Sequence, residues 1–147
     1  MNTALDKVLE QKGRQVYVTS PSQTVLDAIK SMQDKQVGAL VVLDDGNPVG
    51  VFTERDVLNR VVARESNPAE MTVSDVMTKS LVVVSPSTTV QQAMAIVTEK
   101  RCRHLPVMDG DDLVGVVSSG DLTYWVVKSQ SYEIENLIRY ITGKYPA

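Results

Sequence analysis

The chain has 147 residues, of which 43% are hydrophobic and 22% charged, and its formal net charge is −3. This composition is typical of a globular protein and excludes a disordered tail. The small negative charge also excludes an overall basic field that would recruit nucleic acid or acidic lipid. An anion site must therefore come from local cations or backbone amides.

Residues 1–15 are charged and amphipathic, which predicts a helix without the apolar core of an export signal. The apolar runs elsewhere are too short to span a membrane. The single cysteine, Cys102, has no partner for an intrachain disulfide and gives no sign of an oxidising compartment. We therefore expect a cytoplasmic protein that contacts neither a membrane nor nucleic acid.

A repeat at an offset of 65 residues organises the chain. Ser-Pro-Ser at 20–22 recurs at 85–87, and Val-Gly-Val at 49–51 recurs at 114–116. The match continues without a gap to Asp56 and its counterpart Asp121. Because self-similarity at a fixed period marks a repeated structural unit, we expect two copies of one small fold.

The first copy predicts a strand at Val16–Thr19, ending at Ser-Pro, and then a helix capped by Thr24 with apolar residues at helical spacing. Two strands follow, Ala39–Leu43 and Val49–Phe52. The Asp/Gly/Asn-rich segment between them is typical of a hairpin turn. A second helix starts at Thr53, so the unit is β-α-β-β-α.

The second copy repeats this order, with strands at 81–84, 105–108 and 113–117. Thr89 and Gln92 form a capping box at its first helix, and its second helix starts at Ser118. A polar linker at 64–70 and a short turn capped by Thr72 separate the copies. An apolar stripe near the end predicts one more helix, carried by Ile134, Leu137, Ile138 and Ile141 and closed by Gly143 and Pro146.

These patterns predict five segments along the chain. They are an N-terminal helix at 1–15, a first repeat at 16–64, a linker with a short helix at 65–78, a second repeat at 79–128 and a C-terminal helix at 129–147.

As a set, the motifs resemble the CBS domain, named after cystathionine β-synthase, and the pair resembles a Bateman module. The residues that carry the resemblance are Val-Ser-Asp-Val-Met at 73–77, both Ser-Pro-x-x-Thr-Val segments, 103–107 and the endings 50–56 and 115–121. The resemblance covers about residues 16–126. It implies an α/β (α+β) fold of two β-α-β-β-α repeats in a pseudo-twofold arrangement, with flanking helices. It also implies two clefts between the repeats that bind adenine ligands, and pairing of two modules into a disc-like homodimer.

Thr53 with Asp56, and Ser118 with Asp121, each place a hydroxyl and a carboxylate one helical turn apart. A helix N-terminus attracts phosphate, and a carboxylate can accept from both hydroxyls of a ribose. The same spacing is also a variant capping box, so it leaves both interpretations open. The resemblance assigns the residues, with Ser119 beside them, to ligand binding.

The resemblance places the adenine slot at the end of the first strand and the start of the second. It implies Val18, Thr19, Gly38 and Ala39 in the first copy, with Val84, His104 and Pro106 in the second; core and turn packing is the alternative for these positions. Small Gly38 stands where the second copy has Arg103, so the two clefts cannot be equivalent.

The expected phosphate clamps are Arg55 and Arg103, because a guanidinium forms bidentate hydrogen bonds with phosphate. Further candidates are Lys79, Lys100 and Arg101, although the run at 99–101 is typical of a solvated helix end.

We expect a regulatory module that senses energy or redox state and is not an enzyme. The sequence has no P-loop or dinucleotide fingerprint, and a lone Cys102 and His104 make no metal site. The expected ligands are AMP, ADP or ATP, with NAD(H) and, ranked lower, S-adenosylmethionine as alternatives. With no fused effector domain, the output would act in trans on a partner. The competing hypotheses are an assembly module with vestigial pockets and an enzyme that turns over a nucleotide through His104 or Cys102.

Overall fold

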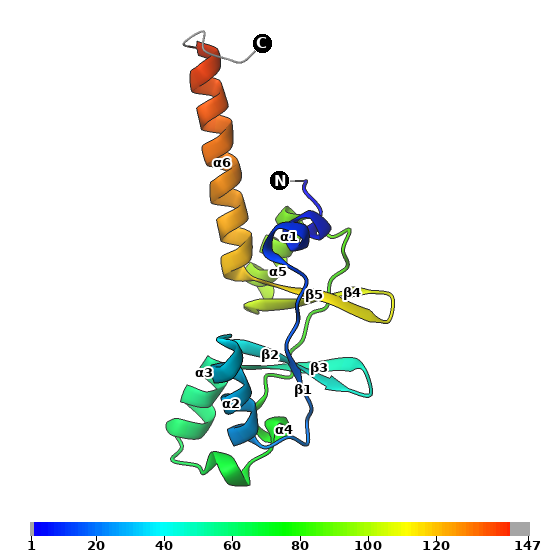
Figure 1. Cartoon of the computed structure of the whole chain (residues 1–147), viewed down its shortest axis with the longest axis vertical. Helices are drawn as coiled ribbons and strands as arrows, with labels where there is room; N and C mark the ends of the chain where they lie inside the picture. The colour runs from blue at the N-terminus through cyan, green and yellow to red at the C-terminus, as the bar shows by residue number, and fades with distance from the viewer. Residues whose placement is uncertain (1, 142–147) are drawn as a thin grey trace.

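The computed structural model describes residues 2–141, and for residues 131–134, 136, 140 and 141 it describes the backbone alone. Two layers with the same elements stack on each other (Figure 1). The first layer contains most of residues 17–76, and the second contains residues 84–141 together with the N-terminal helix. Each layer is one copy of the predicted repeat.

The first repeat folds as predicted, β-α-β-β-α. Its sheet has the order β1-β2-β3, with β1 parallel and β3 antiparallel to β2. The elements are β1 (Val18–Thr19), α2 (Val25–Lys35), β2 (Ala39–Asp44), β3 (Asn47–Thr53) and α3 (Glu54–Val57), which continues as a π-helix at Leu58–Val62. In the turn between β2 and β3, Asp45 and Gly46 both have positive φ, as a two-residue type I′ hairpin requires.

The second repeat reproduces the helix and hairpin of the first at the offset of 65 residues. Its α5 (Val90–Lys100) has the same length as α2, and both helices end at a left-handed residue, Gln36 or Arg101. The antiparallel pair β4 (His104–Asp109) and β5 (Asp112–Ser118) has the register of β2 and β3, including the irregularity after Val42 and Val107. The predicted duplication and fold class are confirmed.

The first strand of each repeat is shorter than predicted. In the first repeat only β1 pairs with β2, and in the second repeat a single bridge joins Val84 to Val107. Val16 and Leu81, which precede the paired residues, line the cavities between the repeats instead of extending the sheets.

Three helices lie ahead of or between the repeats: α1 (Leu5–Lys12), a 3-10 turn at Pro68–Glu70 and α4 (Val73–Val76). At the other end, α6 (Ser119–Ile141) is one continuous helix through the predicted boundary at residue 129, and its second half extends beyond the rest of the molecule (Figure 1). Of the predicted stripe, Leu137 and Ile138 are exposed. The side chains of Ile134 and Ile141, and residues 143 and 146, lie outside what is described.

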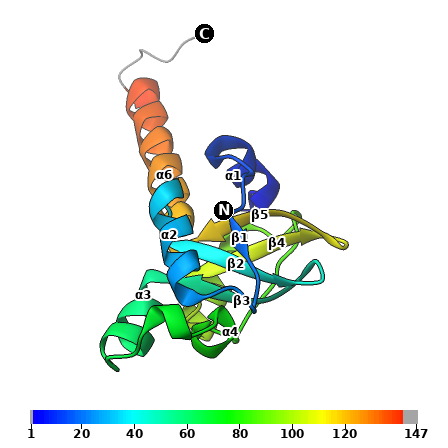
Figure 2. The same ribbon diagram turned by 60° about the horizontal axis from the view of Figure 1, so that its bottom comes forward.

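Each repeat has its own hydrophobic core. The first is built from α2, the β2–β3 hairpin and α4, around Leu40, Phe52 and Val73. The second includes Leu5 and Leu9 of α1 packed with Leu105, so the helix that starts the chain completes the core of the second repeat. Between α1 and β1 the chain therefore passes from the second layer to the first. The two hairpins lie one over the other (Figure 2).

No helix among the described residues is both long and apolar enough to cross a bilayer.

Candidate functional site

Two cavities lie between the repeats, and each contains one of the two predicted aspartates. The Asp56 cleft has a volume of about 440 Å³ and the Asp121 cleft about 650 Å³. Both volumes are in the range of small-molecule sites. Gly38, Val51 and His104 line both cavities, so the two clefts are neighbours across the repeat interface.

Each cleft combines the hydroxyl–aspartate pair of one repeat with a strand entrance from the other. Asp56 shares its cavity with Leu81 and residues 101–104 of the second repeat. Asp121 shares its cavity with residues 12–17 and the start of β2 in the first repeat. A ligand in either cleft would therefore touch both repeats.

Asp56 is held rigidly at the start of α3. Asp56 is 5% exposed, and its carboxylate accepts from the Thr53 backbone N–H at 3.0 Å and from the Thr78 hydroxyl at 2.8 Å. The Asp56 N–H donates in return to Thr53 Oγ1 at 3.2 Å. The capping interpretation of this motif is therefore observed in full.

Asp121 has the same cap but a different neighbour. Its Oδ2 accepts from the Ser118 N–H at 2.8 Å, and it also receives the Lys12 ammonium at 2.6 Å. Burial works to raise the pKa of Asp121. The hydrogen bonds from Lys12 and Ser118 and the charge of Lys12 outweigh that effect and hold the pKa below its ordinary value.

The helix N-termini are less free to bind phosphate than the sequence suggests. The N–H groups of Thr53 and Asp56 donate within the cap, and that of Glu54 donates to Gly38 O at 3.0 Å. In the second repeat the Ser119 N–H donates in the same way to Arg103 O at 2.8 Å. A phosphate group in either cleft would therefore depend mainly on cationic side chains.

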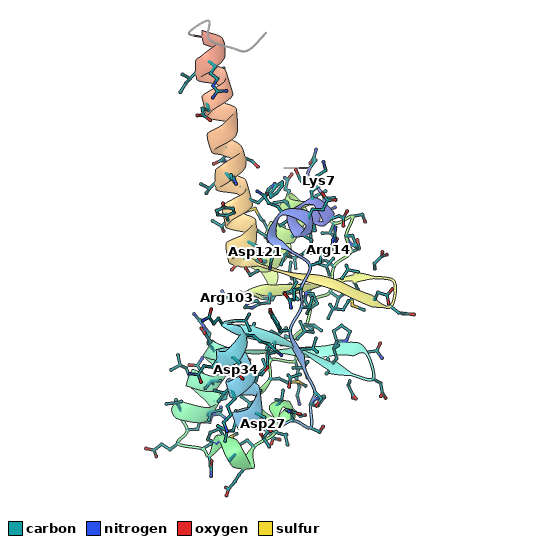
Figure 3. The ribbon with its side chains drawn as sticks, in the orientation of Figure 1. Lys7, Arg14, Asp27, Asp34, Arg103 and Asp121 are labelled. Carbon is teal, nitrogen blue, oxygen red and sulfur yellow. The ribbon has the colours of Figure 1, made fainter. Side chains whose placement is uncertain are left out.

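Three arginines line the Asp56 cleft: Arg55, Arg101 and Arg103. All three are exposed, and within residues 2–141 none of their guanidinium groups forms an ion pair or hydrogen bond. Figure 3 shows Arg103 at the level where the two repeats meet. Arg101, which the sequence places at a solvated helix end, lines this cleft because its left-handed conformation turns the chain from α5 into the interface. Lys79 and Lys100 line neither cleft.

The Asp121 cleft has a different charge arrangement. Its cationic lining residues are Lys12 and Arg14, and both are already paired, Lys12 with Asp121 and Arg14 with Asp6 at 2.8 Å. The two clefts therefore differ in charge, as predicted: the Asp56 cleft has unpaired guanidinium groups, and the cations of the Asp121 cleft are paired with carboxylates.

His104 lies at the boundary of the two clefts. Burial lowers the pKa of its imidazole, the charges of Lys12 and Arg103 lower it further, and Asp121 and Asp56 work in the opposite direction. The net result is an imidazole whose pKa is below its ordinary value.

Several residues assigned to the adenine slot line neither cleft. Val84 and Pro106 are buried, Val84 in the core of the second repeat, Val18 is exposed on β1, and Thr19 is partly buried. Ser119, which was assigned to ligand binding beside Ser118, also lines neither cleft. The cavity linings lie closer to the strand entrances, because Val16 and Leu81 precede the paired residues and face the cavities. Gly38, Ala39 and His104 do line the clefts.

Two residues at the clefts were not singled out by their sequence: Lys12 and Thr78. Both are hydrogen-bonded to a cleft aspartate. Leu-Asp-Lys-Val-Leu at 5–9 resembles Val-Ser-Asp-Val-Met at 73–77, and Lys12 and Thr78 lie shortly after these segments, so the resemblance points to this stretch of chain but not to the two residues themselves.

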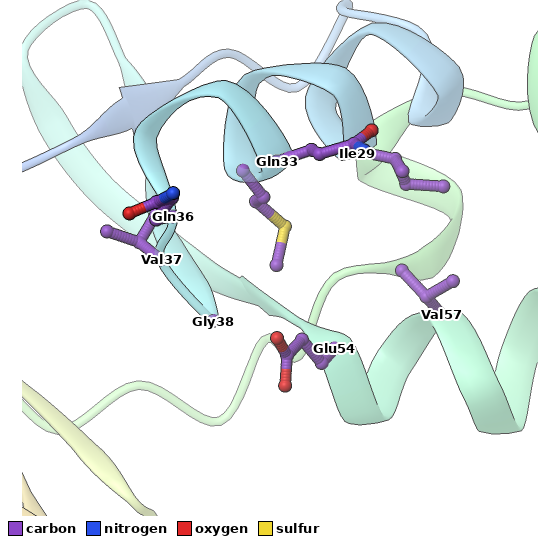
Figure 4. A pocket seen from close by; sticks show the side chains of 8 residues that line it. Ile29, Gln33, Gln36, Val37, Gly38, Glu54 and Val57 are labelled. Atoms are coloured by element: carbon purple, nitrogen blue, oxygen red, sulfur yellow. The ribbon is translucent and has the colours of Figure 1, made fainter.

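A further cavity of about 550 Å³ lies within the first repeat, between α2 and α3 (Figure 4). Ile29, Met32, Val37 and Val57 make it mainly apolar, and Glu54 is the one charged residue in its lining. A negatively charged, cation-free lining does not suit a phosphorylated ligand.

Among the described residues, no three His, Cys, Asp or Glu side chains come close enough together to hold a metal ion. Burial raises the pKa of the Cys102 thiol, against the opposing effects of a backbone hydrogen bond and Lys100, so its reactive thiolate form is disfavoured.

Known proteins share both the sequence pattern and the fold. The family model of the CBS domain matches residues 13–63 and 73–128. The "CBS domain-containing protein CBSX3, mitochondrial" of Arabidopsis thaliana is 36% identical, over 98% of this chain and 74% of that protein. A proposed signal-transduction protein with CBS domains from Burkholderia ambifaria is 39% identical, with a TM-score of 0.80 over 87% of this chain and 96% of that one. The hexameric CBS-CP12 protein from bloom-forming cyanobacteria is 30% identical, with a TM-score of 0.76 over 84% of this chain and 72% of that one.

The stacked repeats with two interfacial clefts define a two-repeat regulatory module. The chain belongs to the CBS-domain family and contains a pair of CBS domains.

Proposed function

We propose that this CBS pair is a sensor that binds an adenine nucleotide in the Asp56 cleft. The observation that carries the proposal is the presence of three unpaired guanidinium groups in the cavity that contains Asp56. Guanidinium groups bind phosphate through charge-assisted, bidentate hydrogen bonds. AMP, ADP and ATP are the proposed ligands; NAD(H) presents the same adenosine, and S-adenosylmethionine, which has no phosphate, ranks below them.

The rest of the cleft suits the remainder of such a ligand. Asp56 offers carboxylate oxygens to the ribose hydroxyls. Val51, Leu58 and Leu81 provide apolar surface for a base. A purine would thus contact β3 and α3 of the first repeat and the strand entrance of the second.

Regulation would follow from the position of the ligand between the repeats. A nucleotide that binds one arrangement of the repeats more tightly than another shifts the population toward it. We propose that a partner protein responds in trans to this change, through a homodimer of modules. We also propose that the protein acts in the cytoplasm and binds its ligand without catalysis. The single cysteine supports a reducing location.

An assembly module that needs no ligand is the second candidate. It is favoured by the internal partners of both carboxylates, since Asp56 binds Thr53 and Thr78 while Asp121 binds Ser118 and Lys12. In that case the aspartates are structural caps.

A thermal-shift experiment separates the two candidates. A ligand at about 100 times its Kd adds roughly 2.7 kcal/mol, which for a domain of this size raises Tm by roughly 5–11 °C. We expect such a shift with at least one of AMP, ADP, ATP and NAD, and its loss in Asp56→Ala. Asp34→Ala, which alters an exposed carboxylate on α2, is the control and should keep the shift. No shift with any adenine ligand, using protein freed of bound nucleotide, would favour the assembly module.

A further inference from the structure

The helix α1 is bound to the second repeat both by buried side chains and by backbone hydrogen bonds. Leu5, Val8 and Leu9 are buried in the core of that repeat. The backbone of α1 is also tied to the turn ahead of α5, with Leu5 N–H donating to Thr88 O and Val90 N–H donating to Thr3 O, both at 2.8 Å. The last residue of α1, Lys12, is therefore held at a fixed place beside the Asp121 cleft.

Residues 71–77 make the equivalent contacts in the first repeat. Val73 N–H donates to Gln23 O, and Val25 N–H donates to Met71 O, both at 2.9 Å. These are the bonds of Leu5 and Val90 transposed onto the other repeat. The two leading segments are thus equivalent, but α1 is a longer helix than α4, with 8 residues against 4.

This difference in length changes which group reaches the aspartate. In the first repeat, Thr78 lies two residues beyond the end of α4: its N–H donates to Val51 O at 2.9 Å and its hydroxyl donates to Asp56. In the second repeat, the ammonium of Lys12 donates to Val116 O at 2.8 Å and to Asp121 Oδ2 at 2.6 Å. Val116 and Asp121 are the counterparts of Val51 and Asp56. One ammonium therefore takes the place of both a backbone amide and a neutral hydroxyl.

The replacement changes what a ligand must overcome. A threonine hydroxyl can rotate and share a carboxylate with incoming ribose hydroxyls without any change in charge. A charge-assisted bond is about twice as strong as a neutral one, so the Lys12 ammonium is the harder group to displace. It also neutralises the carboxylate that would attract donors.

We propose that Lys12 is a built-in competitor for the Asp121 cleft, so that each chain binds one adenine nucleotide, in the Asp56 cleft, and the second cleft opens only when Lys12 is displaced. This inference rests on the proposed function. The neutralised cations of the Asp121 cleft, against three unpaired arginines in the other, favour the same order of occupancy.

Calorimetric titration with ATP, AMP and NAD tests the inference through stoichiometry. Lys12→Met keeps the length of the side chain and removes its charge, and the ammonium end of Lys12 is partly exposed, so the fold should tolerate the change. We expect one site per chain in the native protein and two in Lys12→Met, or a second site whose Kd tightens at least about tenfold. The double variant Lys12→Met with Asp121→Ala should return to one site. Lys7→Met, on the exposed side of α1, should behave as the native protein.

The outcomes are distinct. One site in both native protein and Lys12→Met, two similar sites in the native protein, or a second site that weakens in Lys12→Met would each overturn the role of Lys12 while leaving nucleotide binding intact. Absence of binding to every variant would instead remove the proposed function, and the inference with it.

Discussion

At the residue scale, the two aspartates show that the same helix-capping motif can differ in burial and in hydrogen-bond partners. Asp56 is buried and its partners are a backbone amide and a threonine hydroxyl, whereas Asp121 is only partly buried and is ion-paired. Because Asp56 is buried, removal of its carboxylate would leave the Thr53 N–H and the Thr78 hydroxyl without an acceptor and without water to take its place.

We therefore expect Asp56→Ala to lower the free energy of unfolding by about 1–3 kcal/mol beyond the loss of the helix cap. Asp121→Ala loses the same cap, but water can reach Lys12, so the additional cost should stay below about 1 kcal/mol. Urea denaturation of both variants measures the difference. Equal costs would show that the burial of Asp56 is not what distinguishes it.

His104 makes stability depend on pH. Because its pKa in the folded protein is below the ordinary value of about 6.5, the unfolded chain binds the proton more readily. The stabilisation is present above the unfolded pKa and is lost as the pH falls below it toward the folded pKa.

We expect the free energy of unfolding to fall between pH 7.5 and pH 5.5, and to fall less in His104→Gln. Denaturant titrations at the two pH values measure both slopes. An unchanged slope in the variant would show that His104 does not carry the pH dependence.

At the scale of elements, Gly50 in β3 and Gly115 in β5 occupy equivalent positions under the two leading helices. A Cβ at Gly50 would lie 2.7 Å from the backbone O of Thr78, whereas a Cβ at Gly115 would lie 2.6 Å from Leu9 Cδ2. A backbone carbonyl held in a hydrogen-bonded bridge has less freedom to move than the end of a leucine side chain.

Gly50→Ala should therefore destabilise the protein by about 1–3 kcal/mol, the usual cost of overpacking, and Gly115→Ala by less. Adding Leu9→Ala to Gly115→Ala should cost less than the sum of the two single changes, because each relieves the other. Thermal or urea unfolding of the four variants provides the comparison. Strict additivity would contradict the contact between Leu9 and β5.

The elements also show where sequence was sufficient. Caps predicted the starts of α2 and α5, and turn residues and strand patterns predicted both hairpins to within one or two residues, because these features are local. The role of α1 in the second core was not predictable in that way, since an amphipathic pattern shows that a face is buried but not which repeat covers it. For the same reason Lys12 and Thr78 were missed, while Val84 and Pro106, which satisfy local packing, were assigned to the site.

At the scale of the whole molecule, the second helices of the two repeats leave apolar side chains exposed. Val62 and its counterpart Val127 are 61% and 56% exposed, and Leu58 and Tyr124 lie beside them on the same helices. Such side chains on equivalent helices are suited to a twofold contact between modules.

We expect a dimer by light scattering, and a monomer for Val62→Glu or Val127→Glu, because a buried unpaired carboxylate is costly at an interface. Val83→Glu, at another exposed valine, is the control and should remain dimeric. A native monomer, or dimers in all three variants, would contradict this use of the surface.

The central claim is that the Asp56 cleft holds the phosphates of an adenine nucleotide with its arginines. Equilibrium dialysis of ATP and of adenosine, with native protein and Arg103→Gln, tests it most directly. Arg64→Gln, which alters an exposed arginine outside the cleft, is the control. We expect Arg103→Gln to weaken ATP binding about tenfold or more and to leave adenosine binding unchanged, because only ATP presents phosphate to the guanidinium. Equal ATP binding by the native protein and Arg103→Gln, or no ATP binding by either, would contradict it.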